Sequence, residues 1–280
     1  MHNLGRGGRR SFLTNTIGGL VLASFVPTAL AKDDDVAQHH VTLIDYAAMQ
    51  RMLVKRAAKL YVQFLVGART SDAKRLISDS ISRFESINAK HNAAASGAGS
   101  TMYTIAKALE NIRQDWPKLR ALLLKTPTDK NLPEVIAQSE ALSKQINQST
   151  QSADMFLSRS PIGQFMGIAG KQCYISQRLA MFYFLKVLKY KPEEAAQEIT
   201  KLVGDFEYNK SFLEKGKENS AEIKFLLQLA GTQWPYFKEA INAKQRTEAS
   251  QQDYNVATAA ENMLEVLERI NLLYYKLATS

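Results

Sequence analysis

The sequence predicts an all-α protein made of two tandem antiparallel four-helix-bundle units with long helices. Three observations support this prediction: long segments rich in Ala, Leu, Lys, Glu and Gln after residue 41, few strand patterns there, and an internal repeat. Of the 280 residues, 45% are hydrophobic and 22% are charged, which is ordinary globular composition. The length is enough for two cores.

Glycine and proline residues set the expected helix limits. Gly67 can end the first long helix, the segment NAAASGAGS at 92–100 is expected to form a loop, and Pro192 precedes two glutamates suited to a first helical turn. The pattern predicts helices over 38–66, 72–90, 101–125, 131–157, 162–188, 193–213, 219–243 and 250–278. Helices of this length with short connections are typical of antiparallel bundles.

The chain contains an internal repeat. YAAMQRMLVKRAAKLY at 46–61 aligns with IAGKQCYISQRLAMFY at 168–183, and QDWPKLRALL at 114–123 aligns with TQWPYFKEAI at 232–241. Both tryptophans are therefore followed by proline at equivalent places, and each third helix is expected to kink or restart there. The repeat predicts one unit over 36–156 and a second over 160–280.

Residues 1–31 have the layout of an export signal peptide. Arg6, Arg9 and Arg10 precede a modest apolar run over 17–25, and small residues end the segment at Ala31. RRSFL at 9–13 resembles the twin-arginine signature. The run is too short to span a bilayer, so we expect cleavage after Ala31 and a soluble periplasmic product rather than a membrane anchor.

Composition and motifs argue against several classes of protein. The net charge of +9 is spread along the chain without a basic run of five, so we expect no nucleic-acid partner. A single cysteine excludes an internal disulfide and a Cys-rich metal site. No GxSxG, HExxH, P-loop or GxGxxG pattern occurs, so we expect neither an enzyme nor a cofactor. His39 and His40 near the expected mature terminus do not make a convincing metal site.

One helical stripe of the first expected helix carries two cations in its middle. Its members are Ile44, Ala48, Arg51, Lys55, Ala58, Val62 and Leu65. Arg51 and Lys55 repel each other and need an anion, which is either a bound ligand or a carboxylate on a neighbouring helix. The equivalent stripe of the second unit has Cys173 and Gln177 instead, so the two copies share a pattern but differ in chemistry.

The repeated block resembles the signature of a family of periplasmic sensory domains. AAMQRMLVKRAAKLY at 47–61 and AGKQCYISQRLAMFY at 169–183 are similar to the PilJ-type domain of type IV pilus chemotaxis transducers and to NarX-like nitrate/nitrite sensors. The resemblance implies helical bundles that bind a small anion such as nitrate or nitrite between two protomers. The arginine that holds the anion falls on Arg51 in the first copy and on Cys173 in the second.

The sequence therefore predicts an exported sensory or ligand-binding module, with Arg51 and Lys55 as ligand-binding residues and a homodimer that encloses the anion. A membrane receptor or sensor kinase would receive its signal. The alternative is an interaction module that docks on a membrane receptor or pilus component without a small ligand. Arg56 and Arg178, present in both copies, are expected to tie helices together, and Cys173 is expected to be an inert core thiol rather than a redox sensor.

Overall fold

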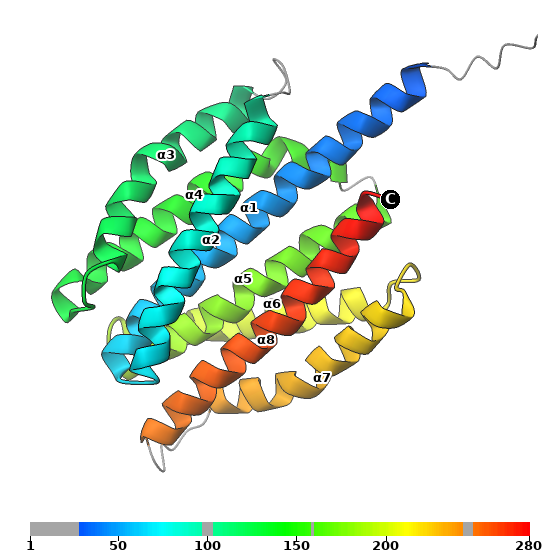
Figure 1. The fold of residues 1–280 in the computed structure, drawn as a ribbon. Coiled ribbons are helices and arrows are strands. Elements are labelled where there is room, and N and C mark those ends of the chain that lie inside the picture. Colours follow the sequence, from blue (N-terminus) through cyan, green and yellow to red (C-terminus); the bar gives the residue numbers. More distant parts are fainter. Residues whose placement is uncertain (1–27, 97–102, 158–159, 243–248) are drawn as a thin grey trace, which may run out of the picture.

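The computed structural model describes residues 28–96, 103–157, 160–242 and 249–280. All regular structure in these ranges is helical, which confirms the all-α prediction (Figure 1). The α-helices are α1 (Thr28–Val66), α2 (Thr70–Ser96), α3 (Tyr103–Leu123), α4 (Leu132–Leu157), α5 (Pro161–Val187), α6 (Pro192–Glu214), α7 (Ala221–Asn242) and α8 (Ala249–Ala278). A 3₁₀ turn, η2 (Asp129–Asn131), precedes α4.

Most helix ends lie where glycine and proline predict them. Gly67 follows α1 with a φ of 86°, a conformation that costs glycine little. Pro161 and Pro192 occupy the first positions of α5 and α6, where the missing N–H group costs no hydrogen bond. The side chain of Ser160 caps α5 by accepting a hydrogen bond from the Gly163 backbone N–H.

Two predicted boundaries were wrong, and of the kink or restart expected at each Trp-Pro pair the restart does not occur. α2 continues to Ser96, so the first part of the expected 92–100 loop is helical; its alanines favour helix, and Ala95 packs in the core. α1 begins at Thr28, ten residues before the expected start. α3 and α7 pass through Pro117 and Pro235 without a restart, and both follow a curved path (Figure 1). The expected signal segment before residue 28 lies outside the described residues.

The two halves of the chain use the same helix contacts. In the first half α1 packs against α2 and α4, and α3 packs against α4; in the second half α5 packs against α6 and α8, and α7 packs against α8. Trp116 stacks on Phe84 with ring centroids 3.9 Å apart, and Trp234 stacks on Phe206 at 4.0 Å. Their indole N–H groups donate to glutamates, Glu85 and Glu207, at equivalent positions of the repeat.

The halves pack together mainly along α1 and α5, which lie side by side in the middle of the molecule (Figure 1). Both helices run antiparallel to α8. Asp45 and Lys59 of α1 contact Asn271 and Glu261 in that order, and Gln177 and Tyr183 of α5 contact Ala260 and Asp253. α1 and α5 therefore run in the same direction.

Candidate functional site

The two halves approach each other closely at Ala48 and Gly170, which are equivalent residues of the repeat. A Cβ atom placed on Gly170 would lie 2.9 Å from the Cβ of Ala48, closer than real Cβ contacts. Small residues at this point let the backbones of α1 and α5 approach each other. Ala48 lines a cavity on each side of this contact.

The larger cavity, which we call the Arg51 cavity, has a volume of about 680 Å³ and lies between α1 and α4 of one half and α5 and α6 of the other. Its lining residues are Ile44, Ala48, Arg51, Glu140, Ser143, Lys144, Asn147, Gly163, Gln164, Gly167, Ile168, Lys171, Tyr174, Tyr208 and Phe212. The family resemblance predicts that a second protomer supplies the helix that closes the site; here α5 of the same chain supplies it.

Positive charge predominates around the Arg51 cavity. Among the described lining residues, Arg51, Lys144 and Lys171 are cationic and Glu140 is the one carboxylate. Glu140 already pairs with the Lys55 ammonium at 2.8 Å and lies 3.7 Å from the Arg178 guanidinium. Among the described residues, no carboxylate lies within ion-pairing distance of Lys144 or Lys171. Both lysines are exposed to solvent, so the described lining favours an anionic ligand through the local excess of positive charge.

Arg51 is half-buried, and its guanidinium donates a hydrogen bond to the Asn147 side-chain oxygen across the α1/α4 contact. This contact positions the planar group at the cavity wall. A guanidinium can engage two oxygens of one anion at once, a geometry that an ammonium lacks.

Lys55, the other predicted ligand-binding residue, does not line the cavity. Its side chain is fully buried, and its ammonium pairs with Glu140 and donates to the Ser139 hydroxyl at 3.4 Å. Burial lowers the pKa of Lys55 to about 8, although the nearby Glu140 carboxylate opposes this shift. The neighbouring-helix carboxylate, which the sequence left open as an alternative partner, is the one found.

The smaller cavity, about 360 Å³, lies on the other side of the α1/α5 contact, and Cys173 lines it where Arg51 lines the first. Its described lining holds two cations, Arg83 and Arg269, and two carboxylates, Glu265 and Glu268, so these charges balance, and Arg83 pairs with Glu268. Burial raises the pKa of the Cys173 thiol, which disfavours the reactive thiolate. Burial of Cys173 is consistent with an inert core thiol, and the expected lack of an anion site in this copy stays a prediction.

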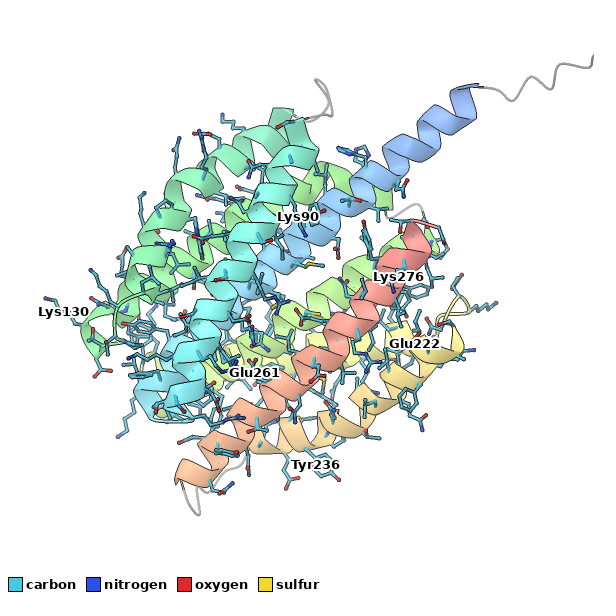
Figure 2. The ribbon with its side chains drawn as sticks, viewed as in Figure 1. Lys90, Lys130, Glu222, Tyr236, Glu261 and Lys276 are labelled. Atoms are coloured by element: carbon cyan, nitrogen blue, oxygen red, sulfur yellow. The ribbon has the colours of Figure 1, made fainter. Side chains whose placement is uncertain are left out.

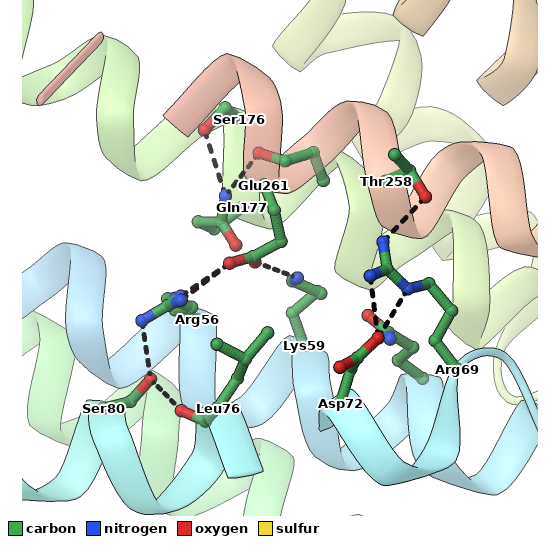
Figure 3. A network of polar contacts seen from close by, with 12 residues as sticks. Arg56, Lys59, Arg69, Asp72, Leu76, Ser80, Ser176, Gln177, Thr258 and Glu261 are labelled. Atoms are coloured by element: carbon green, nitrogen blue, oxygen red, sulfur yellow. Dashed lines mark hydrogen bonds and ion pairs between the residues drawn. The ribbon is translucent and has the colours of Figure 1, made fainter. Parts of the chain in front are cut away.

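A cluster of buried charges joins the halves next to these cavities (Figure 3). Glu261 of α8 accepts hydrogen bonds from the Arg56 guanidinium at 2.7 Å and from the Lys59 ammonium at 2.6 Å. Arg56 also pairs with Asp79, and Arg178 pairs with Glu198. The carboxylate of Glu261 points from α8 toward the first half, whereas Tyr236 on α7 projects outward (Figure 2). The expected tying role of Arg56 is therefore seen in its contacts.

Sequence reasoning missed Lys144, Asn147, Lys171 and Tyr174 as cavity residues. Lys171 and Tyr174 belong to the second repeated block, and their positions flanking the equivalent of Arg51 were a usable signal. Lys144 and Asn147 lie on α4, where no pattern distinguishes them from a solvated face.

The described residues hold no cluster of three or more His, Cys, Asp or Glu side chains that could bind a metal ion. None of the helices in these ranges combines the length and the apolar character needed to cross a bilayer. No protein-family model, no curated protein and no solved structure matches the chain. The resemblance to periplasmic sensory domains thus stays a prediction carried by the two repeated blocks.

Proposed function

We propose that this chain is a non-catalytic ligand-binding module that takes up an anion in the Arg51 cavity. The observation that carries the proposal is the charge of the described lining residues: Arg51, Lys144 and Lys171 are cationic, and the carboxylate described among them, Glu140, is already paired with Lys55. Nitrate and nitrite are the first anions to test, because the repeated blocks resemble nitrate/nitrite sensors.

In this proposal the module works after export to the periplasm, as the RRSFL-containing leader predicts, and passes its signal to a membrane receptor or sensor kinase. Because α5 encloses the cavity from within the chain, anion binding does not require a second copy. We therefore expect binding at concentrations where the protein sediments as a monomer.

The test is a titration of the purified protein with nitrate and nitrite by calorimetry and thermal unfolding. A ligand at a hundredfold excess over its Kd should stabilise the native state by about 2.7 kcal/mol. Arg51→Lys keeps the positive charge but loses the bidentate guanidinium geometry, so it should weaken anion binding by about tenfold. Arg51→Ala removes the charge as well and should weaken binding by more.

Cys173→Ser is the matched control, since it changes the equivalent position of the other copy and should leave anion affinity unchanged. Binding that is equally strong in Arg51→Ala would place the anion elsewhere. A parent protein that binds neither these nor other small anions would refute the proposal.

A second candidate function, docking on another protein, is favoured by the outer face of α7. Phe225 and Tyr236 are 62% and 74% exposed, and their spacing puts both side chains on the same face of the helix. In that case Phe225→Ser with Tyr236→Ser should reduce retention of the protein on membranes that carry its receptor, without changing anion affinity. Unchanged retention would remove this candidate.

A further inference from the structure

The Arg51 cavity is much larger than a bare oxyanion requires. Its volume of about 680 Å³ corresponds to roughly twenty water molecules at liquid density, whereas a three-oxygen anion replaces only about one or two. Cavities of roughly 300–1,000 Å³ are the usual size for organic ligands of drug-like dimensions.

Away from the cationic residues, the cavity wall is apolar and aromatic. Ile44, Ile168 and Phe212 contribute apolar surface, and Tyr174 and Tyr208 contribute aromatic rings. Tyr208 is 72% exposed, as expected of a residue at an opening. A nitrate ion held by Arg51 would leave this apolar surface against water, which is unfavourable.

Two of the aromatic walls are held in place by neighbours outside the cavity. The Arg178 guanidinium lies 5.5 Å from the centre of the Tyr174 ring, and Phe212 packs against Phe165 with centroids 5.4 Å apart. The walls are therefore organised before a ligand arrives, which reduces the entropy cost of binding.

Gly167 leaves part of the space open. A Cβ atom at this position would meet no atom within 4 Å, although the residue lines the cavity. A larger side chain there would extend into the cavity without disturbing the packing of α5.

We propose that the ligand is an organic carboxylate whose apolar, ring-sized body lies against Ile44, Ile168 and Phe212 while Arg51 holds its carboxylate. This inference rests on the proposed function, because both use Arg51. It adds the size and polarity of the ligand: the carboxylate matches the guanidinium fork, and the ring occupies the volume that nitrate leaves empty.

The experiment compares indole-3-acetate with acetate, nitrate and neutral indole, each titrated calorimetrically into the full chain. Indole-3-acetate should bind at least tenfold more tightly than acetate, nitrate or indole, and nitrate should compete with it. Arg51→Lys should weaken the binding of every anion tested. Gly167→Leu should weaken indole-3-acetate about tenfold while the affinity for nitrate changes less than twofold.

The outcomes separate this inference from the proposed function. If nitrate binds through Arg51 but indole-3-acetate binds no better than acetate, the organic ligand is wrong and the small-anion function stands. If Gly167→Leu weakens the binding of nitrate and of indole-3-acetate equally, the apolar body of the organic ligand does not lie in this cavity. If no anion binds, both proposals fail together.

Discussion

The cations of α1 differ in what compensates their charge. Arg56 and Lys59 share Glu261 of α8, and Lys55 pairs with Glu140 of α4, so three of them are neutralised by carboxylates on other helices. Arg51 alone among these four lines the large cavity. Cations one or two turns apart on the same helix thus have different surroundings: three pair with carboxylates of α4 and α8, and Arg51 contributes its guanidinium to the cavity wall.

Glu261→Gln tests how strongly the cross-half ion pairs stabilise the fold. Burial raises the pKa of this carboxyl, but Lys59 and Arg56 outweigh that effect and lower it to about 2. Loss of the charge would leave the fully buried Lys59 ammonium without its partner, so we expect the free energy of unfolding in urea to fall by about 3 kcal/mol. Glu214→Gln, at a partly exposed pair with Lys210, should cost about 0.5 kcal/mol or less. Equal effects would show that the buried cluster contributes no more than a surface pair.

Asp45 is a buried carboxyl that should make stability depend on pH. Burial raises its pKa from 3.8 to about 6, partly offset by a hydrogen bond from Asn271 at 2.8 Å. Because the folded pKa is the higher one, this group stabilises the fold fully below pH 3.8 and loses that contribution as pH rises through 6. The loss is about 3 kcal/mol, since one pKa unit corresponds to about 1.4 kcal/mol.

Asp45→Asn keeps the shape and the acceptor oxygen but cannot ionise. We therefore expect it to raise the free energy of unfolding by up to about 3 kcal/mol at pH 7.5 and to change it little at pH 4, measured by urea unfolding. His91, whose pKa burial lowers to about 4, affects parent and variant alike and cancels in the difference. A gain of the same size at both pH values would mean that Asp45 does not titrate between them.

At the scale of elements, the α1/α5 contact depends on Gly170. Gly170→Ala gains helix propensity worth about 1 kcal/mol but forces the new methyl group against Ala48, which typically costs 1–3 kcal/mol. We expect a net destabilisation of about 1 kcal/mol in urea, recovered when Ala48→Gly is added. Gly204→Ala, where a Cβ meets no atom within 4 Å, should instead stabilise the protein slightly. A stabilising Gly170→Ala would indicate that the helices separate without cost.

The sequence predicts the elements better than it predicts their partners. Helix type and most ends follow from local composition and from residues such as Gly67 and Pro192, which act within their own turn. Arg51 could be singled out as a candidate site residue because a charged side chain on an otherwise apolar helix stripe is visible in the local sequence. The partner of Lys55 could not, because Glu140 is distant in the sequence and meets it only through the packing of α4 on α1.

At the scale of the molecule, two related halves pack against each other within one chain. Their equivalent residues Ala48 and Gly170 meet at the contact, and their divergence at Arg51 and Cys173 leaves one cationic and one balanced cavity. Joining the halves in one chain lets the two sides differ, which identical protomers cannot do.

The two tryptophans allow the unfolding of each half to be followed separately. The chain has only Trp116 and Trp234, one in each half, and each is stacked on a buried phenylalanine. In Trp234→Phe the remaining fluorescence reports the first half, and in Trp116→Phe it reports the second. Since the α1/α5 contact and the ion pairs of Glu261 and Glu140 cross between the halves, separate unfolding would expose buried charge.

We therefore expect a single cooperative transition, with the fluorescence midpoint of each variant in urea equal to its own midpoint by circular dichroism. The circular dichroism signal is the internal control, because it follows helices of both halves and so corrects for any stability lost with the indole. A ligand of the Arg51 cavity should raise both midpoints together, since both halves line that cavity. If one tryptophan reports an earlier transition than circular dichroism, the halves unfold independently, and the cavity between them opens before the rest of the molecule.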